Sequence, residues 1–243
     1  MLNELALFAS VGGGILATKW MLGWRTVCYV EWNKYAVEVL KARIRDGYLD
    51  DAPIWDDANK FDGKPWARLV DVVSAGFPCQ PFSVAGKGLA ENDPRNGWPA
   101  TIRILREVRP RIAWLENVPG LLSKRYFGTI LGELAEAGYD AKWDCVSAEE
   151  TGAPHKRERL WIVAHAASQR LESCGINPSS ASAKETHKDI RRPTIEQCSW
   201  WQIEPKLGRV ADGVAHRVDR LEAVGNGQVP LVVAEAWNRL NEE

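Results

Sequence analysis

The sequence contains few cysteines and no long apolar run. Its five cysteines, in a chain of 243 residues, lie far apart and form no C-x-x-C pair, so neither a disulfide framework nor a zinc site is indicated. No stretch reaches the roughly 18 consecutive apolar residues of a membrane helix, and Glu4 stands where a signal peptide has a basic residue. We therefore expect a cytoplasmic globular protein with no metal site and no membrane partner.

An excess of charge of one sign is also absent. The net charge of −1 argues against a non-specific polyanion binder. Basic side chains exceed acidic ones only in residues 151–220, which indicates either a strip that faces a polyanion or ordinary surface charge. No internal repeat is found. With 45% hydrophobic residues, the chain can bury one sizeable core and at most a small additional lobe.

Apolar runs alternate with amphipathic helical patterns along the first part of the chain. The expected strands are residues 5–8, 26–32, 68–76 and 111–120, and the expected helices are residues 33–47, 100–108 and 126–138. Asn33 is the expected N-cap of the first of these helices, and Gly47 is its expected stop. This order predicts a doubly wound, mostly parallel α/β sheet with helices on both faces. Residues 139–150 and 159–166 follow without a helix between them, which predicts an antiparallel pair at the sheet edge. Such sheets bind ligands at the carboxyl ends of their strands.

The later part of the chain has a different character. Residues 168–197 contain few large apolar side chains and no clear period, so we expect a loop-like or partly disordered segment. Residues 221–243 indicate a turn followed by an amphipathic helix. The expected apolar side of this helix consists of Val232, Val233, Ala236, Trp237 and Leu240.

A glycine cluster, FASVGGG at residues 8–14, joins an expected strand to an expected helix. Backbone without side chains can approach a nucleotide-like ligand at such a place, although a tight turn needs the same glycines. Glu31 ends the next strand run, where a carboxylate can accept hydrogen bonds from both hydroxyls of a ribose. Taken alone, Glu31 is better explained as a solvated surface acid.

Cys79 lies between Pro78 and Pro81, just after the expected strand 68–76. The prolines fix φ on both sides, so the thiol is held at the carboxyl end of a central strand and is expected to face the ligand crevice. Cys28 and Cys145 have instead the pattern of buried structural thiols. To become a thiolate, Cys79 needs a helix N-terminus, a nearby cation, or a substrate that takes up a proton as it is attacked.

Further polar residues are expected beside this thiol. Glu116 lies at the end of the strand after the next helix, so it and Cys79 come from neighbouring loops and can face one small ring. Arg157 and Arg159 stand two apart at the start of a strand and therefore project to the same side. Considered alone, the arginine pair is better explained as a solvated basic face.

The order of these features is more specific than any one of them. The fragments LFASVGGG, VEW, GFPCQPFSVAG, ENVPG, HKRERLWIVA and GNGQVP resemble the cytosine-C5 DNA methyltransferase family over nearly the whole chain, except about residues 168–197. The resemblance implies a class I methyltransferase fold and S-adenosylmethionine as the cofactor. It also implies a catalytic and cofactor-binding domain at 1–167, a short, poorly structured target-recognition segment at 168–220, and a return turn and helix at 221–243 that packs on the catalytic domain.

The resemblance also implies roles for individual residues. Cys79 is the expected nucleophile, Glu116 the acid that binds the base, and Arg157 and Arg159 the substrate-ring and loop anchors. The expected cofactor pocket consists of Phe8, Ala9, Ser10, Gly12, Gly13, Glu31, Trp32, Asp57, Phe77 and Asn226, with Glu31 on the ribose and Asp57 near the adenine amine. The expected substrate contacts are Pro78, Gln80, Ser83, Asn117 and Val118.

The chemistry of the family explains why these residue types are needed. Carbon 5 of cytosine is too electron-poor to take a methyl group directly from a sulfonium, whereas addition of a thiolate at carbon 6 gives an enamine that is nucleophilic at carbon 5. A protonated Glu116 at ring nitrogen 3 and arginine donors at the ring carbonyl would stabilise the developing charge. A base in a duplex must first be flipped out, and a thiol fixed by two prolines adds little ordering entropy to that cost.

The implied function is that of a DNA (cytosine-5-)-methyltransferase of bacterial or phage type that acts on double-stranded DNA. A cognate restriction endonuclease that acts separately is a conceivable partner. The same chemistry on RNA is a close alternative, because no pocket residue distinguishes ribose from deoxyribose. A non-catalytic DNA-binding relative and a nicotinamide oxidoreductase are the alternatives from other classes.

The sequence departs from the family pattern in several places. Ala6 stands where an acidic residue is frequent, Ser10 where glycine is frequent, and His155 where glutamine is usual. Ser10 adds a side chain where the backbone approaches the cofactor. The target-recognition segment is short and polar, so we expect it to read few base edges or to become ordered on DNA. Trp200 and Trp201 would either stack on bases or pin this segment to the core.

Overall fold

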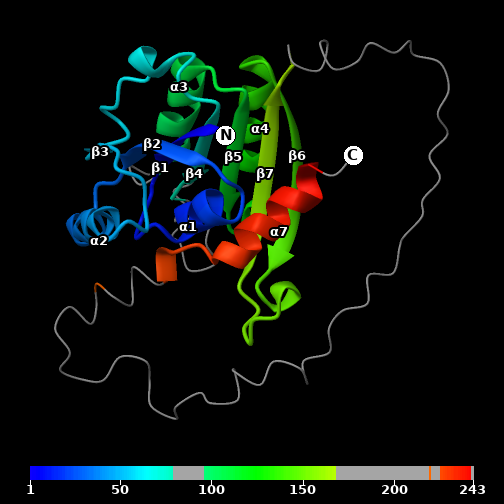
Figure 1. Ribbon diagram of the computed structural model, residues 1–243. Coiled ribbons are helices and arrows are strands. Elements are labelled where there is room, and N and C mark those ends of the chain that lie inside the picture. Colours follow the sequence, from blue (N-terminus) through cyan, green and yellow to red (C-terminus); the bar gives the residue numbers. More distant parts are fainter. Residues whose placement is uncertain (79–95, 168–218, 220–224, 242–243) are drawn as a thin grey trace.

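The computed structural model describes residues 1–78, 96–167, 219 and 225–241 (Figure 1). The predictions for Cys79, Gln80 and Ser83 therefore lie outside the described residues, as do those for the segment 168–197 and for Trp200 and Trp201. The proposed domain boundaries near residues 168 and 220 stay predictions for the same reason.

The described residues form a seven-stranded sheet with the order β3-β2-β1-β4-β5-β7-β6 (Figure 1). The strands are β1 (Asn3–Leu7), β2 (Arg25–Val30), β3 (Ile54–Trp55), β4 (Val72–Gly76), β5 (Ile112–Asn117), β6 (Tyr139–Ser147) and β7 (Glu158–Ala166). Strands β1 to β5 pair in parallel, and β7 runs antiparallel to both β5 and β6. The predicted mostly parallel sheet with an antiparallel edge pair is confirmed.

Helices cover both faces of the sheet. They are α1 (Gly13–Trp20), α2 (Lys34–Arg45), α3 (Trp98–Val108), α4 (Arg125–Glu136) and α7 (Pro230–Asn241), with short 3₁₀ helices η1 (Lys64–Trp66), η4 (Pro119–Leu121) and η5 (Glu149–Thr151). Leu5 and Leu7 of β1 belong to one core with residues of α3 and α4, while Ala6 between them packs with residues of α1 and α2. This alternation explains why β1 is apolar on both faces, as parallel strands in doubly wound folds are.

Local signals place several element ends correctly. The side chain of Asn33 accepts a hydrogen bond from the Ala36 N–H at 3.1 Å and so caps α2, as predicted. Gly47, the predicted stop, follows α2 with a φ of 77°, in the left-handed region that suits glycine. The strand β3 was missed, because two residues within a connection carry no alternating pattern.

The final helix returns to the sheet. Helix α7 buries Val232, Val233, Ala236 and Leu240, and Trp237 is partly buried beside the same core. These residues pack with Ala17 of α1 and with Trp114 and Trp161 of the sheet. The predicted amphipathic helix is confirmed, and its position brings the turn before it to the carboxyl ends of β4 and β5.

Candidate functional site

The loop between β1 and α1 forms one side of the site. Phe8 and Ser10 have φ values of 53° and 49°, and Gly12 has a φ of 84°, so three of its residues adopt left-handed backbone. The Ser10 N–H donates to Oε2 of Glu31 at 2.7 Å, and the Ala9 N–H donates to the Val30 carbonyl at 3.1 Å. The carboxylate at the end of β2 thus holds the loop at the end of β1.

Glu31 is buried, with only 6% of its surface exposed. Its Oε1 accepts the Asn33 N–H at 2.7 Å. Burial raises the pKa of Glu31, and the backbone donors of Asn33, Ser10 and Trp32 act in the opposite direction. Each carboxylate oxygen has a second lone pair, so the group can hold the loop and still accept a hydroxyl donor from a ligand.

Exposed rings and a second carboxylate lie at or just after the ends of β2 and β3. Trp32, after β2, is 77% exposed, and Trp55, at the end of β3, is 46% exposed. Asp57 accepts the Asn59 N–H at 2.9 Å, and this hydrogen bond is the main reason why the pKa of Asp57 is lowered. Apolar rings beside two carboxylates suit the adenosine part of S-adenosylmethionine, so the residues present fit the expected cofactor.

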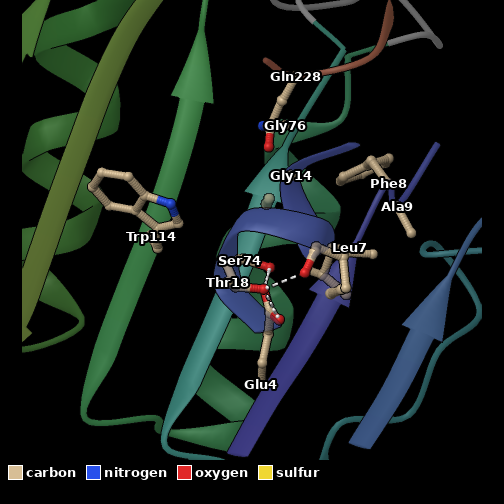
Figure 2. Close-up of a pocket in the computed structure, with 13 residues that line it drawn as sticks. Glu4, Leu7, Phe8, Ala9, Gly14, Thr18, Ser74, Gly76, Trp114 and Gln228 are labelled. Carbon is tan, nitrogen blue, oxygen red and sulfur yellow. Dashed lines mark hydrogen bonds between the residues drawn. The ribbon is translucent and has the colours of Figure 1, made fainter. Parts of the chain in front are cut away.

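A cavity of about 30 Å³ lies beneath the glycine loop (Figure 2). Its lining includes Glu4, Phe8, Ala9, Gly14, Thr18, Ser74, Trp114 and Gln228. A space of this size has room for about one or two water molecules. It lies between α1 and the sheet and is too small to hold S-adenosylmethionine by itself.

A buried carboxylate that the sequence did not indicate lies below this cavity. Glu4 is 1% exposed and accepts hydrogen bonds from the hydroxyls of Thr18 at 2.7 Å and Ser74 at 2.6 Å (Figure 2). It also accepts the Thr26 hydroxyl at 3.1 Å. Burial raises the pKa of Glu4, although the three hydroxyl donors lower it. Because the donors come from α1, β2 and β4, no local sequence pattern announces this group.

Glu116 stands at the end of β5, opposite Gly76 of β4 and Trp161 of β7. Its side chain is 13% exposed, and Nε of Arg159 lies 3.0 Å from its Oε1. Burial raises the pKa of Glu116, while Arg159, Gln228 and Arg157 lower it. The pair has the composition needed to bind a ring that offers both an acceptor nitrogen and a carbonyl.

Arg157 has a different set of partners. It donates to the carbonyl oxygens of Gly225 at 2.8 Å and Gly227 at 2.6 Å. The guanidinium therefore fixes the turn before α7, and Asn226 lies in that turn with an exposed side chain. Of the two predicted arginines, Arg159 lies on the carboxyl group and Arg157 on the turn.

Both ends of the segment that carries residue 79 are defined. Phe77 is buried against Trp98, with ring centroids 5.3 Å apart, and the Gly97 N–H donates to the Pro78 carbonyl at 3.2 Å. Asn117 donates to the Phe77 carbonyl at 3.2 Å, and its Oδ1 accepts the Val118 N–H at 2.9 Å. The end of β4 thus lies next to Glu116, and Asn117 and Gly97 hold the backbone of Phe77 and Pro78 that follows it.

The structure brings the predicted residues together in two groups. The cofactor group lies at the carboxyl ends of β1, β2 and β3, and the Glu116 group lies at the ends of β4, β5 and the start of β7. Sequence reasoning missed Gln228, which contacts both groups, although the fragment GNGQVP contains it. Among its neighbours in this fragment, Asn226 is a predicted site residue, assigned to the cofactor pocket.

Within the part of the chain that the structure describes, no group of three or more His, Cys, Asp or Glu side chains is arranged to hold a metal ion, and no helix is long and apolar enough to cross a membrane.

Two cysteines outside the site lie among the described residues. Cys28 is buried, as predicted, and burial raises the pKa of its thiol to about 12. Cys145 is only partly buried, at the margin of the core.

The chain is similar in sequence to known methyltransferases. It is 35% identical over 167 residues to the type II methyltransferase M.NgoBI of Neisseria gonorrhoeae, covering 67% of this chain and 50% of that protein. It is 32% identical over 164 residues to the type II methyltransferase M.CviJI of Paramecium bursaria Chlorella virus IL3A, covering 67% of this chain and 42% of that protein. The chain spans about half the length of the curated relatives it matches.

Solved structures support the fold. A mutant of DNMT2 from Spodoptera frugiperda matches with a TM-score of 0.59 and 24% identity, over 79% of this chain and 57% of that one. A protein described as a DNA modification methyltransferase of an Escherichia coli prophage matches with a TM-score of 0.56 and 23% identity, over 70% of this chain and 48% of that one. The fold is that of the S-adenosylmethionine-dependent methyltransferases, as predicted.

The family follows from the sequence match. The family model described as C-5 cytosine-specific DNA methylase matches residues 2–217. The chain belongs to this family. This assignment decides against the nicotinamide oxidoreductase, the alternative that the glycine cluster alone suggested.

Proposed function

We propose that the chain carries the catalytic centre of a DNA (cytosine-5-)-methyltransferase, which transfers a methyl group from S-adenosylmethionine to carbon 5 of a flipped-out cytosine. The observation that carries this proposal is the partly buried Glu116, held by Arg159 at the end of β5 and next to the point where the chain leaves β4. The similarity to type II methyltransferases supports duplex DNA as the substrate.

The cofactor would bind at the ends of β1 to β3. S-adenosylmethionine supplies an activated methyl group on a sulfonium. Glu31 would accept the ribose hydroxyls, the exposed indole of Trp32 would cover the adenosine, and Asp57 would accept the adenine amine. Phe8 and the backbone of residues 9–13, which follow β1, would line the part of the pocket nearest the sheet, together with Phe77 and Asn226.

The Glu116 group would bind the cytosine. A protonated Glu116 donates to ring nitrogen 3, and burial favours this protonated form because it raises the pKa of the carboxyl group. Arg159 is then the arginine nearer the ring, and Arg157 fixes the turn of residues 225–227. The surroundings of the base would be formed by Pro78, Gln80, Ser83, Asn117 and Val118. Asn117 would act through its hydrogen bonds to the backbone of Phe77 and Val118.

Cys79 would perform the covalent step. Its thiolate forms a bond to carbon 6 of the ring, and the electron pair of the ring's 5,6 double bond makes carbon 5 nucleophilic. Carbon 5 then takes the methyl group. Loss of the proton from carbon 5 and breakage of the bond between carbon 6 and sulfur restore the aromatic ring and the thiolate. This sequence balances without a metal or an external oxidant.

The setting of the activity belongs to the same proposal. The relatives are named as type II methyltransferases from bacteria and a virus, which supports a role in DNA modification beside a restriction endonuclease that acts separately. Such enzymes act where DNA is present, so we place the protein in the cytoplasm of a bacterial or phage-infected cell.

The test is transfer of a labelled methyl group from S-adenosylmethionine to duplex DNA, with tRNA as the competing substrate and Cys79→Ala as the control. We expect label in DNA and none in tRNA, and bisulfite sequencing of host DNA should locate 5-methylcytosine in a defined context. Label in tRNA alone would establish the RNA alternative. Absence of transfer despite binding of duplex DNA would establish a non-catalytic relative.

A further inference from the structure

Gln228 holds the second oxygen of the Glu116 carboxyl group. Its Nε2 donates to Oε2 of Glu116 at 3.3 Å, whereas Arg159 binds Oε1. The two donors come from different parts of the chain, because Arg159 lies on β7 and Gln228 on the turn before α7. The carboxyl group is therefore fixed from two sides, and a second lone pair on each oxygen remains for a ligand.

Three glycines make room for Gln228. A Cβ on Gly13 would lie 2.5 Å from the Gln228 carbonyl oxygen, and a Cβ on Gly14 would lie 1.9 Å from its Oε1. A Cβ on Gly76 would lie 3.0 Å from its Nε2 and 3.0 Å from Oε2 of Glu116. Figure 2 shows Gln228 beside Gly76 and Gly14. Alanine at position 13 or 14 is incompatible with this placement of Gln228 unless something shifts.

The same glutamine thus contacts both halves of the site. Gly13 and Gly14 begin α1, directly after the loop that Glu31 holds, and Gly76 ends β4 directly before the chain turns toward Cys79. The glycine cluster, which the sequence suggested for the close approach of a ligand, also leaves the space that Gln228 occupies. A shift of the start of α1 would move the glutamine and, through it, the carboxyl group.

We propose that Gln228 is a positioning residue that fixes the Glu116 carboxyl group relative to the cofactor loop. The proposal rests on the proposed function for its effect on methyl transfer. Gln228 acts through Glu116 and is not itself a catalytic residue. Its amide favours one orientation of the carboxyl group and stabilises the ionised form, because a donor hydrogen bond to a carboxylate favours the charged state.

The first experiment replaces the donor. Gln228→Met keeps the length of the side chain and removes the hydrogen bond, while Gln228→Glu puts a carboxylate beside Glu116. In Gln228→Met we expect the single-turnover methyl-transfer rate to fall about tenfold, with KM for S-adenosylmethionine within about twofold of the parent. Asn238→Met, which replaces an exposed amide on α7, is the matched control and should change neither value.

The pH dependence separates positioning from a structural role. The charged side chains that act on Glu116 are Arg159 and Arg157, and neither residue is substituted in these variants. Loss of the Gln228 donor raises the pKa of Glu116, so the alkaline limb of the rate profile should move to higher pH in Gln228→Met and further in Gln228→Glu. A loss of rate with an unmoved limb would overturn the proposal.

The role of the glycines that make room for Gln228 can be tested without changing the glutamine. Gly14→Ala should displace Gln228 and lower the rate, whereas Gly132→Ala in α4, where a Cβ meets nothing within 4 Å, should not. When Gln228→Ala removes the obstacle, adding Gly14→Ala should cost no further rate. Additive losses would show that Gly14 acts independently of Gln228 and would count against the proposal.

A measurement without substrate distinguishes this proposal from the proposed function. The carboxyl carbon of Glu116 is followed by ¹³C NMR during a pH titration, with its signal assigned by its absence in Glu116→Gln. We expect the midpoint to rise in Gln228→Met, with Gln228→Leu as a second variant should the first fail to fold. An unchanged midpoint would overturn the role of Gln228, whereas a parent that titrates as expected but methylates no nucleic acid would overturn only the proposed function.

Discussion

Nε of Arg159 lies 3.0 Å from Oε1 of Glu116, and this ion pair joins the start of the antiparallel strand β7 to the end of the parallel strand β5. The antiparallel direction of β7 is what makes the contact possible. It brings the beginning of β7, rather than its end, to the carboxyl edge where the site lies.

Replacement of Glu116 by glutamine should lower the rate of methyl transfer about 100-fold or more, because glutamine has no acidic proton to give to the ring. The measurement is the single-turnover rate with labelled S-adenosylmethionine. Aspartate at this position keeps the acid but shortens the side chain, and it should also be slow because it no longer reaches both Arg159 and Gln228. A Glu116→Gln protein as fast as the parent would contradict the role of the acid.

The same substitution has a pH-dependent effect on stability. Burial raises the pKa of Glu116 above its ordinary value of 4.5, so the stability that the protonated group contributes is full below pH 4.5 and is lost as the pH rises through the folded-state pKa. Glutamine does not ionise. The free energy of unfolding of Glu116→Gln, relative to the parent, should therefore increase as the pH rises above 4.5 in urea titrations. A flat difference would contradict a raised pKa.

Glu4 should be a strong determinant of stability. Glu4→Val removes the acceptor of the hydroxyls of Thr18 and Thr26, which are buried, and of Ser74, which is partly buried. Thr18 can still donate to the Ile15 carbonyl at 3.2 Å, whereas the Thr26 and Ser74 hydroxyls lose their bond to Glu4 at a cost of about 1 kcal/mol or more each. We expect a loss of about 2 kcal/mol in the free energy of unfolding, measured in urea, and a smaller loss for Glu4→Gln, which keeps one acceptor oxygen. Glu38→Ala on exposed α2 is the control and should lie within about 0.5 kcal/mol of the parent.

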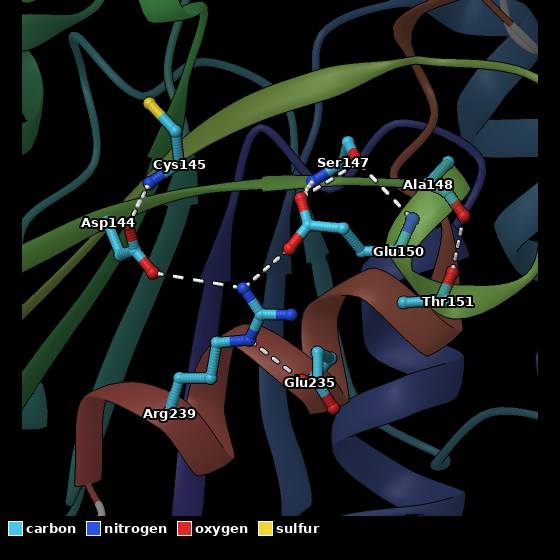
Figure 3. Close-up of polar contacts among 8 residues, drawn as sticks. All are labelled: Asp144, Cys145, Ser147, Ala148, Glu150, Thr151, Glu235 and Arg239. Atoms are coloured by element: carbon cyan, nitrogen blue, oxygen red, sulfur yellow. Dashed lines mark hydrogen bonds and ion pairs between the residues drawn. The ribbon is translucent and has the colours of Figure 1, made fainter. Parts of the chain in front are cut away.

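Arg239 attaches α7 to the β6–β7 connection (Figure 3). It contacts Glu235 at 2.7 Å within the helix and Glu150 of η5 at 2.7 Å, and it lies 4.0 Å from Asp144 of β6. We expect Arg239→Met to destabilise the fold by about 1 kcal/mol at low salt and by less at about 1 M salt, because the partly exposed network is screened. An effect independent of salt would indicate packing of the arginine stem instead.

Ser10 occupies a backbone conformation that favours glycine. Its φ of 49° costs an L-residue about 1 to 2 kcal/mol. Glycine would relieve this strain, but part of the gain would be lost because glycine gives the unfolded chain greater conformational freedom. Ser10→Gly should therefore raise the free energy of unfolding by about 0.5 to 1 kcal/mol. Gly152→Ala, at a φ of 87° with nothing within 4 Å of the added Cβ, should show the reverse effect of strain alone.

Much of the fold could be predicted because its signals are local. The buried runs of β1, β2, β4 and β5, the Asn33 cap and Gly47 follow directly from composition and spacing. The two-residue strand β3 could not be predicted, because it has too few residues to show a period. Its position depends on pairing with Tyr29 and Val30 of β2, which is a tertiary effect.

The candidate site was predictable only where order along the chain coincides with a strand end. Glu31, Glu116 and the arginine pair are of that kind. Glu4 and Gln228 are not, because their partners come from elements far apart in sequence and no spacing rule joins residue 228 to residues 14 and 116. Sequence spacing likewise does not show that Arg157 binds the carbonyl oxygens of residues 225 and 227 while Arg159 binds Glu116.

The most direct measurement uses duplex DNA in which the target cytosine is replaced by 5-fluorocytosine. Fluorine at carbon 5 cannot leave as a proton does, so in the presence of S-adenosylmethionine the protein should stay attached to the DNA under denaturing conditions. The account predicts this covalent complex for the parent and none for Cys79→Ala. A parent that methylates ordinary duplex DNA yet is released from the fluorinated duplex, or a Cys79→Ala protein that still methylates, would contradict it.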